Sequence, residues 1–282
     1  MKMHTANYII DSQLQWAAKE KITLEGYTKR VDDNLFNHEL HPETRKEYQR
    51  GKGHELDGKQ AHMKALHSSS ALVVNVFDYW RRQNRIQDIA SCCGAEGVVT
   101  SMEFEKTQPI KGMERTPPHL DIEFIGPLPL AIESKFTETY HKKTRRDNED
   151  THLDIYLDHH AIWYKLTKVK ALAESICRRS GARTDFEYLD VPQLIKHILG
   201  LKSNYPDRFS LLYLWYKINS NETKRHEEEL KRFSVSIMGE IDFQTMTYQD
   251  LFDSIRCLPD VDPSYFEYLR QRYFSVKYPA ID

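Results

Sequence analysis

Two short segments joined by a proline-rich turn constrain the fold of this chain more than any other part of its sequence. One segment contains Ile122 and Phe124 and the other contains Leu130 and Ile132, apolar side chains that suit strands. Between them, residues 126–129 read Gly-Pro-Leu-Pro, a sequence typical of a turn. The sequence therefore predicts an antiparallel β-hairpin.

Three charged side chains fall on one side of this hairpin. If the turn is centred on Pro127, Asp121 faces Glu133 across the strand pair, with Cβ atoms about 5 Å apart. Lys135 follows Glu133 by two residues and shares its face. Two carboxylates this close repel each other unless a positive group lies among them, and a divalent cation is the usual one. The hairpin therefore predicts a metal site.

The same residues resemble the signature of the PD-(D/E)XK nuclease superfamily, which has the restriction-endonuclease-like fold. In that signature a Pro-Asp or similar pair precedes an (Asp/Glu)-X-Lys on the next strand. Residues 132–135, Ile-Glu-Ser-Lys, match the second half, whereas His119 and Leu120 separate Pro118 from Asp121 in the first half. Residues 67–72 and 133–138 are similar to a branch of bacterial restriction-type proteins. The resemblance covers roughly residues 50–256.

This resemblance implies both a fold and an activity. The implied fold is α/β, with a central mixed sheet flanked by helices and a helical N-terminal extension. The implied activity is Mg²⁺-dependent hydrolysis of DNA phosphodiester bonds by an endonuclease, of restriction or defence type. Mg²⁺ also suits the residues, because carboxylate oxygens without His or Cys are hard ligands. Mn²⁺ is expected to substitute for it.

The resemblance also implies roles for individual residues. Asp121, Glu133 and the backbone carbonyl of Ser134 would bind the metal, and Lys135 would orient the attacking water. Many members of the superfamily recruit a further acid from a helix before the sheet, and Glu55 is the candidate for it here. A glutamate at a helix start, favoured by the helix dipole, is the alternative interpretation of Glu55.

Periodicity and capping signals predict the remaining elements. The expected helices cover 11–19, 42–51, the segment after the serine cap at 68–70, 153–179, the segment opened by Pro192, 222–232 and 248–256. The expected strands, besides the hairpin, cover 98–106, 209–216 and 233–237. This order favours a mixed sheet with helices on both faces. We predict an N-terminal extension over 1–50, a nuclease-like core over 51–256 and a tail over 257–282.

Charge on the whole chain does not indicate nucleic acid, because 40 basic and 42 acidic residues leave a net charge of -2. Any DNA-binding surface must therefore concentrate its basic residues locally. The cluster expected to do so, at the mouth of the site, is Lys142, Lys143, Arg145 and Arg146. Two further clusters, at 81–85 and 178–183, can equally be cations at a helix C-terminus or a solvated face.

The sequence also bounds location and partners. No apolar stretch approaches the roughly 20 residues of a membrane span, and the first residues lack the apolar run of a signal peptide. Four cysteines without a disulfide or zinc-binding spacing favour a reducing, cytoplasmic location. The expected partner is double-stranded DNA rather than a membrane. Cleavage of both strands by one site per chain would favour a homodimer.

Three alternatives remain open on the sequence alone. The chain could be a catalytically silent nuclease-like domain that binds nucleic acid or a partner protein. It could be a glycoside hydrolase using Asp121 and Glu133 as acid and base, which leaves Lys135 without a role. The three residues could also be the polar face of an exposed hairpin with a weak salt bridge.

We expect Lys135→Met to lower the rate of DNA cleavage far more than it lowers DNA affinity. An ammonium group beside two carboxylates keeps its proton, so its role is to position the water and the phosphate. Single-turnover cleavage and an equilibrium binding titration on the same duplex measure the two quantities. An equal loss in both would contradict this role.

Overall fold

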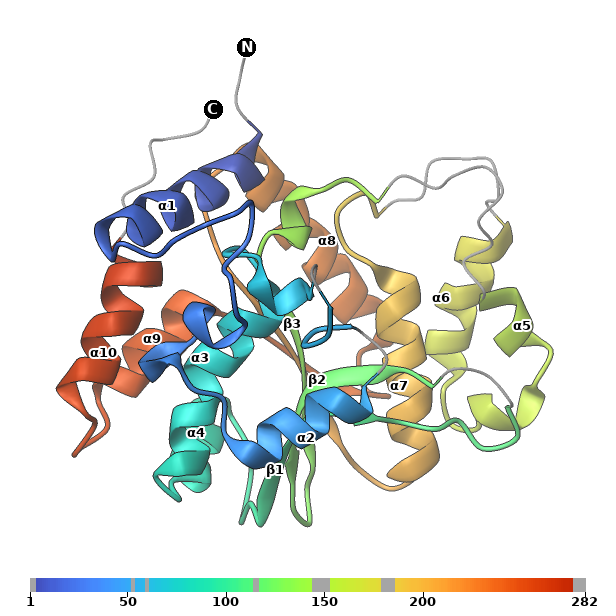
Figure 1. Cartoon of the computed structure of the whole chain (residues 1–282). Coiled ribbons are helices and arrows are strands. Elements are labelled where there is room, and N and C mark those ends of the chain that lie inside the picture. Colours follow the sequence, from blue (N-terminus) through green and yellow to red (C-terminus); the bar gives the residue numbers. More distant parts are fainter. Residues whose placement is uncertain are drawn as a thin grey trace.

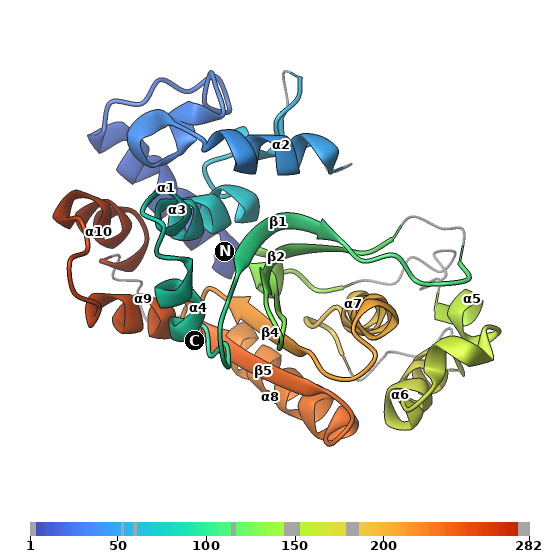
Figure 2. The ribbon, with the colours of Figure 1, turned by 90° about the horizontal axis from the view of Figure 1, so that it is seen from below.

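The computed structural model describes residues 4–51, 54–58, 61–113, 117–143, 153–178 and 186–275. Its centre is a five-stranded sheet in the order β1-β2-β3-β4-β5, seen from below in Figure 2. The strands are β1 (Ser101–Thr107), β2 (His119–Ile125), β3 (Leu130–Lys135), β4 (Ser210–Trp215) and β5 (Asp242–Thr247). β1, β2 and β3 pair antiparallel, whereas β3, β4 and β5 pair parallel. The sheet is therefore mixed, as predicted.

Helices cover both faces of this sheet (Figures 1 and 2). One face packs on a first core that includes residues of α1 (Thr5–Lys19), α3 (Ser69–Arg82), α4 (Ile86–Cys92), α9 (Tyr248–Arg256) and α10 (Pro263–Leu269). The other face packs on a second core that includes residues of α5 (Leu153–Leu157), α6 (Thr167–Arg178), α7 (Val191–Asn204) and α8 (Asn221–Ile237). Helix α2 (Pro42–Arg50) lies against β1. This is the layered arrangement expected from the order of elements.

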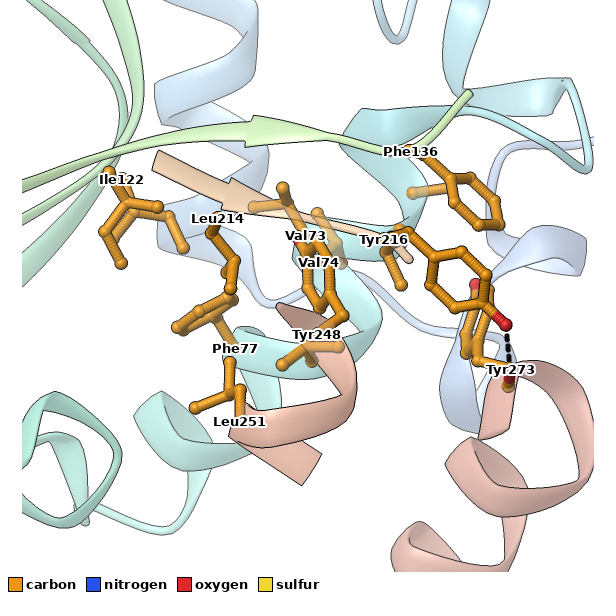
Figure 3. Packing of buried hydrophobic residues seen from close by; sticks show 14 of the residues in the cluster. Val73, Val74, Phe77, Ile122, Phe136, Leu214, Tyr216, Tyr248, Leu251 and Tyr273 are labelled. Carbon is orange, nitrogen blue, oxygen red and sulfur yellow. Dashed lines mark hydrogen bonds between the residues drawn. The ribbon is translucent and has the colours of Figure 1, made fainter. Parts of the chain in front are cut away.

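The interior strand β4 explains why its sequence is an unbroken apolar run. Leu212 and Leu214 belong to the first core, whereas Leu211, Tyr213 and Trp215 belong to the second. Successive side chains of a strand point to opposite faces, so a strand covered on both faces needs apolar residues at every position. Figure 3 shows the first core, where Leu214 and Ile122 of the sheet lie near Phe77 of α3 and Leu251 of α9.

The prediction of one long helix over 153–179 is wrong. The chain forms α5, then a 3₁₀ turn at His160–Trp163, and only then α6. Lys165 adopts φ 60°, which an α-helix does not accommodate. A single helix would place Leu153, Tyr156, Ala161 and Tyr164 on one inner stripe. Leu153 and Tyr156 are buried in the second core, whereas Ala161 and Tyr164 are exposed.

The strand predicted over 233–237 is also wrong, because these residues form the last turns of α8. Phe233 and Ile237, four apart, both lie in the second core, as residues on one helical face do. A short apolar alternation fits a strand and a helix equally well. The true edge strand, β5, follows at Asp242–Thr247, and only partly buried side chains mark it.

Other predicted elements are confirmed, with adjusted ends. α1 ends at Lys19 but begins at Thr5, and α2 begins at Pro42. The Ser68 hydroxyl caps α3, and a capping box formed by Thr247 and Asp250 opens α9. No helix in the described part of the chain is long and apolar enough to cross a membrane.

The two ends of the chain are tied together through one buried cation. Arg272, in the segment predicted as a tail, is fully buried and stacks on the ring of Trp16 in α1 at 4.1 Å. Its five N–H groups donate to oxygens of Gln13, Asn34, Leu66 and Tyr268. No carboxylate is among these partners. Figure 1 shows α1 beside α10 accordingly. The domain boundaries at 50 and 256 stay predictions, but both terminal segments share the first core.

We expect Arg272→Met to lower the free energy of unfolding by about 3 kcal/mol, because it leaves buried carbonyl and amide oxygens without donors. Arg270→Met is the matched control, because Arg270 pairs with Glu267 at the surface and its replacement should leave the free energy of unfolding almost unchanged. Urea denaturation followed by circular dichroism measures both. Equal stability of the two variants would contradict the role assigned to Arg272.

Candidate functional site

The candidate site lies where the pairing of β2 and β3 ends. The last paired residues are Ile122 and Ile132, and the register places Asp121 opposite Glu133 one step further on. Beyond Ile122 and Ile132, a carboxylate oxygen of Asp121 accepts a hydrogen bond from the backbone N–H of Ser134, at 2.6 Å. Asp121 and Glu133 therefore both lie at the point where the pairing of β2 and β3 ends.

Glu133 and Lys135 form a buried ion pair on the face of the sheet that α7 covers. The Lys135 ammonium donates to one carboxylate oxygen of Glu133 and, at 3.0 Å, to the side-chain oxygen of Gln193. The other carboxylate oxygen of Glu133 lies 3.3 Å from Nε2 of His197. Only 2% of Glu133 is exposed, so the pair is shielded from water. This burial excludes the exposed hairpin with a weak salt bridge.

The protonation states follow from this crowding. Burial, and then the neighbouring Glu133 carboxylate, raise the pKa of Asp121 well above its usual range. Burial by itself would lower the pKa of Lys135, but the surrounding carboxylates, Glu133 first, outweigh it and raise the pKa. Burial lowers the pKa of His197 although Glu133 opposes it, so this imidazole is neutral at pH 7. Lys135 is therefore a permanent cation here and cannot serve as a base near neutral pH.

Glu55 lies in the segment before α3, beside a cavity of about 400 Å³. One of its carboxylate oxygens is 3.6 Å from His62, and the other is buried without a hydrogen-bond partner. Burial raises the pKa of Glu55, and the nearby Glu138 carboxylate adds to this effect. Glu138 lines the same cavity and, although burial opposes it, Lys135 lowers its pKa. Glu55 thus shares a cavity with Glu138, which in turn lies near Lys135, but Asp121, Glu133 and Lys135 do not line this cavity.

Two acidic or phenolic groups of this region were not expected from the sequence. Glu105 lies in β1, where strand alternation predicts that it shares the half-exposed face of Glu103. Burial, and then Glu55 and Glu133, raise its pKa to about 7. The Tyr48 hydroxyl of α2 is buried without a partner, and burial followed by Glu105 and Asp121 raises its pKa. The alternation of residues did not indicate Glu105 or Tyr48 as part of this region, because alternation predicts which face of the sheet a side chain occupies and not where the backbone turns.

Gln193 and His197 were also missed, although the sequence carried a signal for them. They lie four residues apart and therefore on one face of α7, between apolar positions that belong to the second core. His197 is buried and Gln193 is half-buried, and polar side chains in such positions need polar partners. Those partners are the two residues of the E-x-K motif, Glu133 and Lys135.

The predicted DNA-binding cluster is only partly described. Lys142 forms an ion pair with Glu187 at 2.8 Å, and burial lowers the pKa of Lys143. Arg145 and Arg146 lie outside the described residues, as does most of the cluster at 178–183. In the cluster at 81–85, Arg81 lies in the last turn of α3, as the interpretation of a cation at a helix C-terminus predicts, and it is buried and paired with Glu47.

The donor set fits a hard divalent cation better than a zinc ion. Asp121, Glu133 and the Ser134 carbonyl offer oxygen ligands, which suit a hard cation. In the described part of the chain, no group of three or more His, Cys, Asp or Glu side chains could hold a metal ion. A site with two carboxylates, a carbonyl and retained waters is what Mg²⁺ accepts.

Comparison with known proteins agrees with this architecture. A mixed sheet flanked by helices, with acids and an E-x-K triplet at neighbouring strand ends, defines a restriction-endonuclease-like α/β protein. The chain belongs to the family described as "Restriction Endonuclease associating with ARP", whose family model matches residues 3–274. The predicted resemblance to restriction-type proteins is thus confirmed. No curated protein and no solved structure matches the chain.

The raised pKa of Glu105 predicts a pH dependence of stability. Because the folded chain binds the Glu105 proton more tightly than the unfolded chain, the free energy of unfolding falls as pH rises from about 4.5 to about 7. We expect Glu105→Gln to be more stable than the wild type by about 2 kcal/mol at pH 8, and no more stable near pH 4.5.

Urea denaturation across this pH range measures the difference. Glu103→Gln is the control in the same strand, because Glu103 pairs with Lys106 at 2.8 Å and loses a favourable partner when neutralised. A stability difference between Glu105→Gln and the wild type that does not change with pH would contradict the assignment.

Proposed function

We propose that this chain is a Mg²⁺-dependent endonuclease that hydrolyses DNA phosphodiester bonds, with a restriction or defence role. The observation that carries the proposal is the arrangement of Asp121, Glu133 and Lys135 at neighbouring strand ends, within a restriction endonuclease family. A glycoside hydrolase is disfavoured by that family membership and by Lys135, whose buried pairing with Glu133 has no use in that chemistry.

In the proposed reaction, Asp121, Glu133 and the Ser134 carbonyl would hold the cation. When bound, a divalent cation supplies charge stabilisation at the phosphate and lowers the pKa of a bound water. Lys135 keeps its proton, and two of its three N–H groups are directed to Glu133 and Gln193, so the third would donate a hydrogen bond to the attacking water or to a phosphate oxygen. The neutral His197 ring holds Glu133 in place through Nε2, provided that this nitrogen carries the proton.

The proposed partners follow from the same site and the family description. Double-stranded DNA would enter beside Lys142, Lys143, Arg145 and Arg146, and a homodimer would place one site on each strand. The family description names association with ARP, so a complex with a protein of that name is proposed as well. A nuclease-like domain that only binds nucleic acid or a partner protein is the alternative that the next experiment separates.

Purified protein is incubated with supercoiled, linear duplex and single-stranded DNA, with Mg²⁺ or with EDTA. We expect Mg²⁺-dependent cleavage that falls by at least about a hundredfold in Glu133→Gln, which keeps the side-chain shape and loses the charge. Glu227→Gln is the matched control at the surface, where Glu227 pairs only with Lys217 at 2.6 Å, and should cleave normally.

Cleavage that survives in EDTA, or that survives Glu133→Gln, would contradict the proposed site. Absence of cleavage by the wild type on all three substrates, with DNA bound in a gel-shift titration, would favour the silent domain. Circular dichroism checks that the wild type, Glu133→Gln and Glu227→Gln share one fold. A loss of cleavage in Glu133→Gln alone then reports on the site and not on folding.

A further inference from the structure

The cavity beside Glu55 is separate from the residues of the E-x-K motif but adjoins them. Its volume is about 400 Å³, within the range of small-ligand sites, about 300–1,000 Å³. Its wall comes from Tyr27, from the segment 55–70 and from Thr137 and Glu138 after β3. Glu138 also accepts the backbone N–H of Phe136 at 2.7 Å, and Phe136 directly follows Lys135. A molecule in the cavity would therefore lie close to the end of β3.

Two polar groups on this wall have no partner in the described part of the chain. The Oε2 atom of Glu55 is buried and accepts no hydrogen bond there. The half-buried ring of His67 forms no hydrogen bond or ion pair with a described residue. Burial lowers the pKa of His67 although Glu138 opposes it, so the ring is neutral at pH 7 and offers one N–H and one lone pair. Buried polar groups are normally hydrogen-bonded, so these two call for a polar ligand.

The charges of the wall disfavour two common kinds of occupant. A phosphate group would lie against the carboxylates of Glu55 and Glu138, and like charges this close repel each other. A metal ion is disfavoured because, within the described ranges, no three His, Cys, Asp or Glu side chains are grouped to hold one. An uncharged molecule that donates a hydrogen bond to a carboxylate fits the wall best.

An exposed aromatic ring lies at the same cavity. Tyr27 is 39% exposed, and its ring contacts no other aromatic ring of the described residues. Among the residues that the structure describes, the other exposed Tyr, Phe or Trp is Tyr164, which does not line the cavity. Any nucleobase can stack on such a ring through its flat face, while its edge carries hydrogen-bond donors and acceptors. A flat stacking surface beside unpartnered polar groups therefore matches a nucleobase.

We propose that this cavity binds one unpaired nucleobase with an amino group, in which Tyr27 stacks on the base, Glu55 accepts a hydrogen bond from the amino group and His67 pairs with the rest of the edge. Cytosine fits this set, because its amino group is a donor and the neighbouring ring nitrogen is an acceptor. The position of the base beside the bond that is cut rests on the proposed function. Glu55 thereby recognises a base, in place of the catalytic role that the resemblance implies.

A base inside a regular duplex cannot reach a cavity of this kind. It must be unpaired, as in a single strand or at a mismatch, or it must rotate out of the stack. Rotation costs the free energy of the broken pair, and this cost is smallest where the pair is already missing. The proposal therefore predicts that the protein binds DNA with an unpaired base more tightly than the same duplex fully paired.

The test measures DNA binding by fluorescence anisotropy in EDTA, where metal-dependent cleavage does not occur. The probes are one duplex fully paired, the same duplex with a single mismatched cytosine, and the same duplex with a mismatched thymine at that position. We expect the dissociation constant of the wild type to be about tenfold lower for the mismatched cytosine than for the paired duplex. Thymine, which lacks the amino group, should lose most of this advantage.

Two variants assign the preference to the cavity. Tyr27→Leu removes the stacking surface and should weaken binding of the mismatched cytosine by about tenfold. Tyr164→Leu is the matched control, an exposed tyrosine away from the cavity, and should bind as the wild type does. Glu55→Gln can donate to the thymine carbonyl, so the preference for cytosine over thymine should fall. Thermal melting checks that Tyr27→Leu folds, which its exposure leads us to expect.

The outcomes separate this inference from the proposed function. If the wild type binds all three duplexes equally, or if the preference survives in both Tyr27→Leu and Glu55→Gln, the inference is overturned whether or not Mg²⁺ supports cleavage. If Glu55→Gln keeps the preference but cleaves every substrate slowly, Glu55 is a catalytic acid and its role here is refuted.

If the preference is present and the variants lose it, the inference stands, and a protein that then fails to cleave with Mg²⁺ refutes only the endonuclease. Cytidine monophosphate is the last probe. Binding of this nucleotide that Tyr27→Leu weakens, with no preference among the duplexes, would assign the cavity to a free nucleotide and overturn the assignment to DNA.

Discussion

The buried ion pair between Lys135 and Glu133 is the interaction on which the rest of the site depends. Two ions removed from water are stable only when further groups satisfy their remaining donors and acceptors. Gln193 does so for Lys135, and His197 does so for Glu133. This requirement fixes the face and register of α7 against β3. The helix that covers the second core therefore also holds the charged triplet at the strand end.

The opposite side of the molecule is fixed by a different constraint. Arg272 is buried without a carboxylate and is satisfied by neutral oxygens from α1, from the loop at Asn34 and from Leu66. Because these oxygens come from segments far apart in the sequence, the first core closes only when both ends of the chain are in place. The segment that carries Glu55 continues to Leu66, whose carbonyl accepts a hydrogen bond from Arg272. Arg272 therefore helps to fix the segment that precedes α3.

The sequence predicted the motif and the sheet well, because both depend on local rules. Alternation, turn residues and the E-x-K spacing predict that Asp121 lies on one strand of a hairpin and Glu133 and Lys135 on the other, as β2 and β3 show, and the apolar run at 209–216 identifies the interior strand β4. It failed at 153–179 and 233–237, where amphipathic patterns fit more than one element. It also did not indicate the left-handed backbone at Glu105, which changes the face that alternation assigns to this side chain. Tertiary contacts decide these cases, and the local pattern of a single sequence does not reveal tertiary contacts.

The backbone distortion at Glu105, opposite Asp121, lowers the stability of the sheet at the strand end where the candidate site lies. Regular pairing of β1, β2 and β3 through this point would relieve the strain at φ 50° and satisfy the ladder, but it would send the Glu105 side chain to the face of Glu103. The chain instead retains strain at Glu105, a buried Tyr48 hydroxyl without a partner among the described residues, and carboxylates with raised pKa values at Glu55, Glu105 and Asp121. Each of these features lowers the stability of the folded chain, so folding alone does not explain the geometry at this strand end.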